Sequence, residues 1–432
     1  MEQLIQSTAV RRAIPFLVLL VSGVMVYQAV RLWIADAQIH ADSVETIAKG
    51  AQLEPGNAAA WDTLGRYQQL DFINSDPAQA LESYKHAVRD DPRSAPFHMN
   101  LAAAYEADGD IPHAREQFEK AREVYPLSAE VAWNYGNFLL RQDQPSEGYS
   151  QIQRAVQIDP SLLTLGVSRT WRSSHDVHIL LDQVLPRQPE AYFQALDFFV
   201  SIHQTEPALV VWQRLTALGQ LITLSRAFPL LDELIAQDQS TDAHRVWIEA
   251  LAAAGLPHDE PVNHSAIWNG LFTTDFENGG LGWRYDLAFG VSIEFDSAPA
   301  GLDGRSVRLD FGGGSNPEIL QPMQYVPVQP SRLYHFSASI RTEGISTESG
   351  VRFSIRDPNH PEAPMVETEN LTGSHPWSLA TADISTGPQT HFVVVRLHRA
   401  PSRLFENKLS GSVWIANVSM SMAENKPGSS NE

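Results

Sequence analysis

Residues 93–126, RSAPFHMNLAAAYEADGDIPHAREQFEKAREVYP, are the clearest indication of the architecture because neighbouring segments repeat their pattern. The segment closes with Pro126, and prolines recur 34 residues before and after it, at Pro92 and Pro160. The same step of 34 residues relates three further sets of positions: Ala87, Ala121 and Ala155; Tyr84, Phe118 and Ile152; Ala80, Ala114 and Gly148. A fixed period of this length indicates stacked structural repeats.

The pattern also extends to the opening of each repeat. Leu64-Gly65, Leu101-Ala102 and Tyr135-Gly136 occupy matching places, and the first gap is three residues longer than the second. The extra residues fall in 72–76, which we expect to form the turn between the two helices of the first unit.

These residues resemble the tetratricopeptide repeat, whose pattern is Trp-x2-Leu-Gly followed by Tyr, Ala, Phe, Ala and Pro. The first unit matches the opening of the pattern at Trp61, Leu64 and Gly65. The second unit matches at Leu101, Tyr105, Ala114, Phe118, Ala121 and Pro126. Small residues allow paired helices to cross closely, large residues fill the space between them, and proline ends the second helix. The resemblance covers residues 58–160 and implies an all-α solenoid.

Residues 161–256 keep a helical pattern but lose the strict motif. A spacing of 35 residues relates three pairs of apolar residues: Ala208 and Ala243, Trp212 and Trp247, Phe199 and Leu234. We interpret this segment as degenerate repeats; the alternative is an unrelated helical pack.

The resemblance also implies a binding site for a protein partner. In this family the first helices build a concave face on which peptides commonly lie. By register, six residues should point toward this groove: Arg66, Met99, Asn100, Trp133, Asn137 and Arg141. Some relatives hold a C-terminal carboxylate with lysines and asparagines, but Met99 and Trp133 stand where a lysine would be expected, which argues against that ligand. The alternative is that Met99 and Trp133 pack between helices.

An uncharged apolar stretch runs from Ala13 to Val30, and beyond Arg31 the residues Leu32, Trp33 and Ile34 extend it into the interface. A helix of about 18 residues spans ~27 Å, close to the ~30 Å hydrocarbon thickness of a bilayer. The stretch has no polar face, which argues against a buried core helix. We therefore predict a transmembrane segment over residues 13–34. Downstream, Ile47, Gly50 and Pro55 fit a lone second helix, so the anchor should run almost directly into the stack.

Charges on either side of the span predict its orientation. Arg11 and Arg12 precede it, and beyond Arg31 the acidic residues Asp36 and Asp42 dominate. The positive-inside rule therefore places residues 1–12 in the cytoplasm and the bulk of the chain outside it, on the periplasmic side of an inner membrane. A cleaved signal peptide is the rival, because Ala35-Asp36-Ala37 resembles a cleavage site; the apolar run is longer than usual for such a peptide, so an uncleaved anchor is favoured.

Composition excludes several functions. The formal net charge is −20 and no basic stripe with interleaved aromatics is present, so binding to nucleic acid is not expected. The chain has no cysteine, which excludes disulfides, zinc–thiolate sites, iron–sulfur clusters and thiol nucleophiles.

Beyond a predicted linker at residues 257–264 the periodicity changes to two. Alternating runs at 307–311, 334–340, 351–355, 392–395 and 413–415 are separated by Gly, Pro, Asn and Asp clusters. Short strands with such turns predict an antiparallel all-β sandwich.

Landmarks in residues 265–422 resemble carbohydrate-binding-module jelly rolls. They are Asn269-Gly270-Leu271-Phe272, Phe276-Glu277-Asn278-Gly279, Gly282-Trp283, Gly304 to Leu309, Tyr325 to Val328, Trp377 and Gly411 to Val418. The resemblance implies polysaccharide binding through exposed aromatic side chains, and the candidates are Tyr285, Tyr325, Trp377 and Trp414. The alternative is that these aromatics pack in the core. Core packing is favoured for Trp377 and for the landmark Trp283. In relatives an aspartate linked to calcium often lies near the last strand. Here Ala416-Asn417 stands in that place, so no cofactor is expected. A structural calcium stays an open alternative.

Signatures of catalysis are not found. The sequence has no Gly-x-Ser-x-Gly elbow, no His-Glu-x-x-His, no P-loop and no Gly-x-Gly-x-x-Gly. His175 and His178 offer two imidazoles without a third metal ligand, so no metal site is expected. We predict a non-enzymatic, membrane-anchored scaffold accessory to envelope or exopolysaccharide assembly. The alternatives are a pure protein–protein scaffold and a glycan-processing enzyme with an unrecognised site.

Overall fold

The computed structural model describes residues 8–41, 43–70, 75–257, 265–286, 288–298, 300–360 and 362–423. The chain divides into two compact units, Met1–Pro186 and Arg187–Glu432. The predicted linker (257–264) and a predicted flexible tail (423–432) lie outside the described residues apart from Pro257 and Ala423, as does most of the predicted insertion at 72–76. The predicted domain boundaries at residues 160, 256 and 264 therefore stay predictions.

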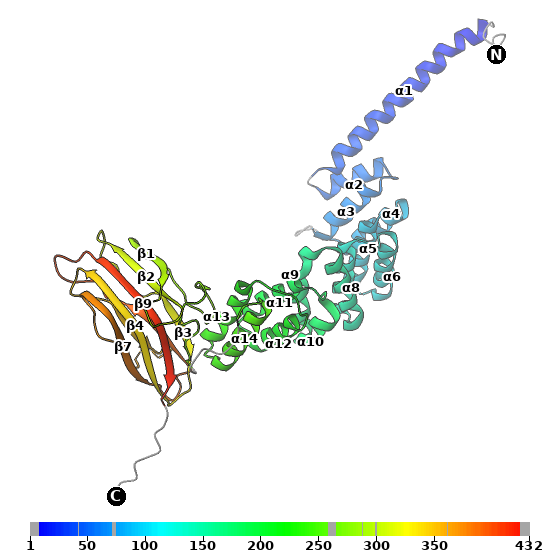
Figure 1. Cartoon of the computed structure of the whole chain (residues 1–432). Coiled ribbons are helices and arrows are strands. Elements are labelled where there is room, and N and C mark those ends of the chain that lie inside the picture. The colour runs from blue at the N-terminus through cyan, green and yellow to red at the C-terminus, as the bar shows by residue number, and fades with distance from the viewer. Residues whose placement is uncertain are drawn as a thin grey trace. The chain divides into compact units, whose positions relative to one another are not determined.

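The first unit begins with one long helix, α1 (Thr8–Ile39) (Figure 1). Its segment Ala13–Ile39 is long and apolar enough to cross a membrane, and none of its apolar window is buried in the protein. A core helix would be mostly buried, so that interpretation is wrong, whereas a membrane anchor and a signal sequence both fit. The helix extends beyond the predicted span of residues 13–34 at both ends.

The C-terminal end of α1 is part of the repeat stack. It packs against α2 (Val44–Leu53), the predicted lone second helix, and Ala35 is fully buried. Ile39 joins Ile47 and Leu64 in a small core that reaches α3 (Ala58–Leu70). Ala35 and Ile39 are four residues apart and therefore share one face of α1. α1 thus supplies the partner that α2 would otherwise lack.

The repeats follow as packed pairs: α3 with α4 (Pro77–Asp90), α5 (Ala95–Asp108) with α6 (Ile111–Val124), and α7 (Ala129–Arg141) with α8 (Pro145–Ile158). Small residues lie where the helices cross, as predicted. A Cβ at Gly65 would stand 2.8 Å from the ring of Tyr84, and one at Gly136 would stand 3.0 Å from the carbonyl oxygen of Gly148. The unit ends with η2 (Pro160–Leu162), α9 (Leu163–Ser174), α10 (Val177–Ile179) and η3 (Leu180–Val184).

Capping residues fix where the second helices begin. The carboxylates of Asp76 and Asp110 accept hydrogen bonds from the backbone N–H groups of Gln79 (3.0 Å) and His113 (3.3 Å). These bonds satisfy donors that the first turn of a helix leaves free. Pro77 and Pro112 occupy the first turns, where a missing N–H costs nothing.

The second unit opens with two helix pairs that repeat each other's buried positions. They are α11 (Pro189–Ser201) with α12 (Thr205–Thr216), then η4 (Leu224–Ala227), and α13 (Phe228–Ala236) with α14 (Ser240–Ala253). Trp212 of α12 and Trp247 of α14, which are 35 residues apart, are both fully buried. The predicted periodicity of this segment therefore corresponds to equivalent core positions in successive pairs.

The rest of the second unit is a β-sandwich. Its strands are β1 (Val291–Ser297), β2 (Arg305–Gly312), β3 (Met323–Pro327), β4 (Leu333–Ile345), β5 (Arg352–Arg356), β6 (Val366–Glu367), β7 (Gly373–Ser385), β8 (Phe392–His398) and β9 (Ser410–Met422). They form an antiparallel five-stranded sheet, β1-β2-β9-β4-β7, and an antiparallel four-stranded sheet, β3-β8-β5-β6. A shared core that includes Trp283, Phe336 and Phe353 fills the space between the sheets. The predicted fold class, a helical repeat region followed by an antiparallel all-β region, is confirmed.

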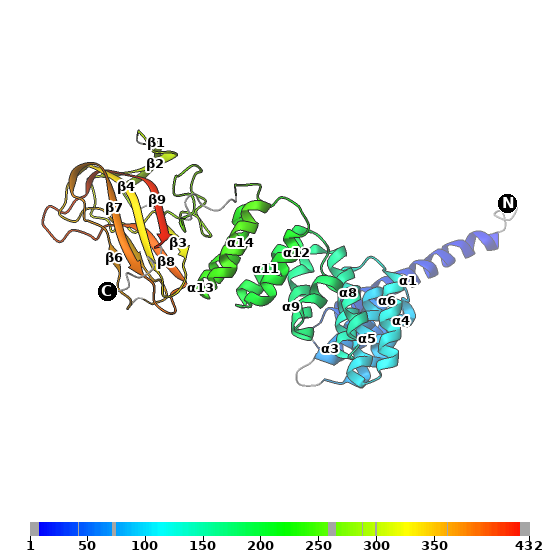
Figure 2. The same cartoon turned by 60° about the horizontal axis from the view of Figure 1, so that its bottom comes forward.

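The sandwich packs directly on the last helix pair of its unit, and α14 contacts β3 (Figure 2). Gly279 and Gly280 lie against Phe228 and Trp247, and a Cβ at Gly280 would stand 2.6 Å from the ring of Trp247. The indole of Trp268 meets that of Trp247 edge to face, with 6.0 Å between centroids. The helices and the sandwich therefore share a continuous contact.

Candidate functional site

Two predicted groove residues, Arg66 and Asn100, meet at a buried carboxylate. Nδ2 of Asn100 in α5 donates a hydrogen bond to Oδ1 of Asp62 in α3 (2.7 Å), and Nε of Arg66 lies 3.5 Å from Oδ2. Burial raises the pKa of Asp62, although the hydrogen bond from Asn100 and the charge of Arg66 lower it. The cluster joins the first helices of two successive repeats.

A second link of the same kind joins the next two first helices. The guanidinium of Arg141 in α7 holds both carboxylate oxygens of Glu106 in α5, at 2.8 and 2.7 Å. Gln142 donates a third hydrogen bond to this carboxylate (3.2 Å). The hydrogen bond to Glu106 raises the pKa of Arg141. Arg141 thus has an intramolecular partner on the predicted binding face.

The remaining predicted groove residues lie closer to the helix packing. Met99 is only 8% exposed and belongs to the core of α5, α6 and α7, with Asn134 Nδ2 at 3.9 Å from its sulfur. Trp133 and Asn137 are half-buried, and Asn137 donates to the carbonyl oxygen of Trp133 (2.9 Å). Met99 thus packs between helices, the alternative that the sequence left open. Partner binding by the six residues stays a prediction.

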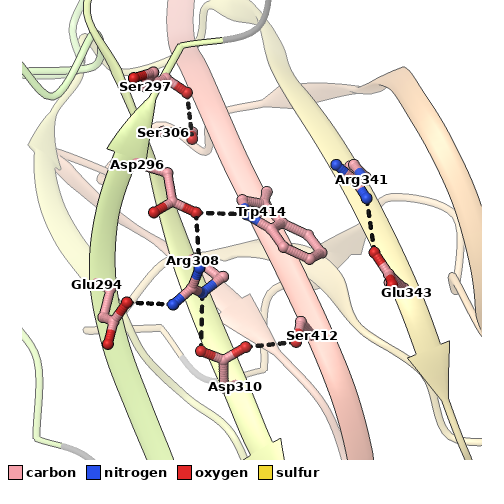
Figure 3. Close-up of polar contacts among 10 residues, drawn as sticks. All are labelled: Glu294, Asp296, Ser297, Ser306, Arg308, Asp310, Arg341, Glu343, Ser412 and Trp414. Carbon is pink, nitrogen blue, oxygen red and sulfur yellow. Dashed lines mark hydrogen bonds and ion pairs between the residues drawn. The ribbon is translucent and has the colours of Figure 1, made fainter.

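In the sandwich, the predicted sugar-stacking residue Trp414 lies at the centre of the outward face of the five-stranded sheet (Figure 3). Arg308 and Arg341 are its direct neighbours across the adjacent strands. Its Nε1–H donates to Oδ2 of Asp296 (2.9 Å), and the guanidinium of Arg341 lies over its ring, 4.4 Å from the centroid. One face of the indole and its only donor are therefore already occupied within the protein.

Carboxylates outnumber guanidiniums around Trp414. Arg308 forms ion pairs with Glu294, Asp296 and Asp310, and Arg341 pairs with Glu343 at 2.7 Å (Figure 3). Four carboxylates therefore share two guanidiniums. This face is acidic, and its ionic groups are arranged mainly toward one another.

The other three aromatic candidates do not join Trp414 in one platform. Tyr325 in β3 lies on the four-stranded sheet, with the guanidinium of Arg284 5.0 Å from its ring centroid. Tyr285 is half-buried and packs on Phe276, with 5.7 Å between centroids. Trp377 in β7 is half-buried and lies outside the core cluster, so the core packing favoured for it is not seen. Sugar binding by these four residues stays a prediction.

Sequence reasoning missed the arginines on the outward face of the four-stranded sheet. Arg352 and Arg356 in β5 and Arg396 in β8 alternate with the core residues Phe353, Ile355 and Val395. The alternation Arg-x-Ser-x-Arg in residues 352–356 was the available signal. It identifies one face of a strand, but not the neighbouring strand that shares it.

One acidic group has an unusual environment. Burial raises the pKa of Glu277, its Oε2 is buried without a hydrogen-bond partner, and Thr274 donates to Oε1 (3.2 Å). The nearby Asp275 forms an ion pair with Arg305 (2.9 Å), so the two acids do not form a matched acid–base pair. Among the described residues, no group of three or more His, Asp or Glu side chains could hold a metal ion.

Comparisons with known proteins identify the helical segment. Family profiles described as tetratricopeptide repeat match residues 72–132 and 104–162. No curated protein matches the chain.

Several solved structures resemble parts of it. The crystal structure of MamA is 15% identical, with a TM-score of 0.26 over 40% of this chain and 84% of that one. Pseudomonas aeruginosa PilF is 14% identical, with a TM-score of 0.28 over 52% and 90%. YrrB, described as a tetratricopeptide-repeat protein with an unusual peptide-binding site, is 16% identical, with a TM-score of 0.25 over 49% and 94%. Similarity at this level does not extend to function. The profile matches over residues 72–162 and the packed helix pairs of the described part, from residue 75 onward, together establish tetratricopeptide repeats in this segment.

Proposed function

We propose that this protein is a non-catalytic scaffold that is anchored in a membrane and holds a protein partner on its repeats. The observation that carries the proposal is the continuity of α1. One helix contains the predicted membrane span, residues 13–34, and directly after it the buried residues Ala35 and Ile39, which pack in the repeat stack. A partner held by the repeats would therefore be kept at a defined distance from the membrane.

Repeats of this type commonly present a groove formed by their first helices. The links Asp62–Asn100 and Glu106–Arg141 lie along those helices and fix the spacing between successive repeats. A rigid groove loses little conformational entropy when it binds an extended segment. We propose that the exposed residues between these links, among them Ala103 of α5, contact the partner.

The orientation of the anchor follows from charge. Arg11 and Arg12 precede the apolar segment, so the N-terminus should stay in the cytoplasm and the repeats should lie on the periplasmic side of the inner membrane. Envelope or exopolysaccharide assembly is the process in which such a tether would operate.

A second candidate function is polysaccharide binding by the sandwich. It is supported by two half-buried aromatics on the sheets: Tyr325 of β3, which lies beside the guanidinium of Arg284, and Trp377 of β7. Sugars combine apolar C–H faces with hydroxyls, so they need aromatic and polar side chains together. Glu277 lacks a matched second carboxyl, which favours a binding module over a glycan-processing enzyme.

The experiment for partner binding is site-specific photo-crosslinking in cells. A photoreactive residue at Ala103 or Asn137, on the first helices, should trap one protein of defined mass. The same residue at Glu123, which is exposed on the second helix α6, serves as the control. Equal trapping from Glu123 would contradict a groove on the first helices. A topology reporter after Glu432 that is active only in the cytoplasm would contradict the orientation.

The experiment for sugar binding is affinity electrophoresis of the full chain in detergent against a panel of polysaccharides. Retardation by one member would support the second function. If folded protein migrates unretarded through every gel, the sandwich does not bind these polysaccharides and the pure protein–protein scaffold stands.

A further inference from the structure

The outward face of the four-stranded sheet carries a group of arginines that the acidic chain as a whole does not suggest. Arg396 of β8 lies directly opposite Ser354 of β5, and Arg356 lies opposite Val394. Arg356 and Arg396 are therefore diagonal neighbours on adjacent strands, a relationship that typically separates two residues by about 7–8 Å and their Cβ atoms by less. Tyr325 of β3 lies on the other side of Val394. We call Arg356, Arg396 and Tyr325 the arginine site.

The other cations of this face have carboxylate partners. Arg352 and His398 both bind Glu367, at 3.2 and 2.7 Å. Arg284, beside Tyr325, forms an ion pair with Asp232 of α13. Arg356 and Arg396, by contrast, form no ion pair with any described residue.

The contacts of the two guanidiniums are few. Arg396 donates through Nε to Oγ of Ser354 (3.0 Å), which is fully buried beneath it. Arg356 has no hydrogen bond or ion pair with any described residue. Burial lowers the pKa of Arg396, and the positive charge of Arg356 lowers it further, while Glu318 and Glu367 act in the opposite sense. Two cations are thus held near each other, and of their donors only Nε of Arg396 has a hydrogen-bond partner among the described residues.

We propose that the arginine site binds carboxylate groups of an acidic polysaccharide. A guanidinium presents two parallel N–H donors that match a carboxylate, and a bound anion would relieve the repulsion between Arg356 and Arg396. Arg284 lies over one face of Tyr325, and the other face of the ring offers an adjacent aromatic surface for a sugar ring. The inference rests on the proposed sugar-binding function and names the class of polysaccharide.

A polysaccharide fits this place better than an acidic peptide does. Extended peptides bind sheets at an edge strand, where backbone N–H and C=O groups are free. Arg356 and Arg396 belong to β5 and β8, which are the two inner strands of the order β3-β8-β5-β6. Only side chains are presented there, which suits a ligand recognised through hydroxyls, ring faces and carboxylates.

The test is affinity electrophoresis of the full chain in detergent through gels containing alginate, dextran or poly-L-glutamate. Because the chain has a net charge of −20, nonspecific electrostatics would repel it from alginate. Retardation by alginate is therefore expected to require a local cationic site. Loss of one charge-assisted contact should weaken it about tenfold in Arg356→Gln. Arg332→Gln, which removes an exposed arginine elsewhere on the sandwich, should leave it unchanged.

A second variant separates geometry from charge. Arg396→Lys keeps the charge but loses the planar pair of donors, so it should also weaken retardation by alginate. Equal circular dichroism spectra and thermal transitions would show that the variants are folded.

Each other outcome overturns the site in a different way. Equal retardation of Arg356→Gln and the unmodified chain by alginate removes the arginine site. Retardation by dextran alone overturns the preference for acidic sugars and leaves polysaccharide binding intact, whereas retardation by poly-L-glutamate alone assigns the face to peptides. Unretarded migration in all gels overturns the site together with the sugar-binding function.

Discussion

The carbonyl oxygen of Ala35 lies against Gly50, so closely that a Cβ at residue 50 would stand 3.0 Å from it. The same Cβ would stand 3.0 Å from Cβ of Gln38 and from Cγ1 of Ile39. Glycine therefore lets α2 approach the end of α1 backbone to backbone. This contact packs the C-terminal end of the apolar helix directly against the repeats.

Gly50→Val should loosen the contact between α1 and α2. The added Cβ and its two methyl groups would meet backbone and Cβ atoms that cannot move alone, at a cost of about 1–3 kcal/mol. Hydrogen exchange should increase in peptides that cover residues 31–53. Gly56→Val is the matched control, because a Cβ at Gly56 meets nothing within 4 Å. Equal exchange in the two variants would show that the contact contributes nothing to stability.

The mature protein should retain residues 1–37. Proteolytic cleavage favours exposed, flexible backbone, whereas the small-x-small motif Ala35-Asp36-Ala37 lies within α1 and Ala35 is fully buried. The intact mass of protein purified from membranes should match the full-length chain. A mature chain that begins at Gln38 would contradict both the uncleaved anchor and its role as a tether.

The repeat fold could be predicted from sequence because its constraints are local and periodic. Ala121 and Ala155 recur at 34 residues since each occupies the same helix crossing, and both are fully buried. Alternation in 307–311 predicted β2 for the same reason: a strand exposes one face and buries the other. A single sequence contains such patterns in full.

The candidate sites were harder to predict because they depend on which neighbours the fold supplies. Trp414 looks like a stacking residue in sequence, but Asp296 and Arg341 reach it from β1 and β4. Likewise, Asp62 and Asn100 are 38 residues apart and meet only because successive first helices are parallel neighbours. Cross-strand and cross-repeat contacts of this kind have no signature in local sequence.

Asp62→Asn should make the first repeats more stable at neutral pH. Burial raises the pKa of Asp62 above its ordinary value of 3.8, so the folded state binds the proton more tightly than the unfolded chain. This stabilising contribution is fully present below pH 3.8 and is lost as the pH rises through the raised pKa. Asparagine stays neutral and can still accept from Asn100, so the gain at pH 7 should be on the order of 1 kcal/mol.

Protection factors from hydrogen exchange in α3 and α5 would measure this effect at pH 4 and pH 7. The difference between variant and unmodified chain should be larger at pH 7. Glu130→Gln, at an exposed position on α7, controls for the loss of a negative charge. Lower protection in Asp62→Asn at pH 7 would mean that the ion pair with Arg66 outweighs burial.

Gly280→Ala should separate the sandwich from the last helix pair. Gly280 has φ +56°, a conformation that is unfavourable for alanine, and its Cβ would stand 2.6 Å from the ring of Trp247. Two costs therefore add: backbone strain, on the order of 1 kcal/mol, and displacement of an indole that also packs on Trp268.

Gly301→Ala isolates the cost of backbone strain, because Gly301 has φ +87° and open space at its Cβ. If the contact with Trp247 holds the sandwich on the helices, only Gly280→Ala should increase hydrogen exchange in α13 and α14, while the core strand β9 stays protected. Equal effects of the two variants would mean that strain alone acts and that the contact with Trp247 does not couple the helices to the sandwich.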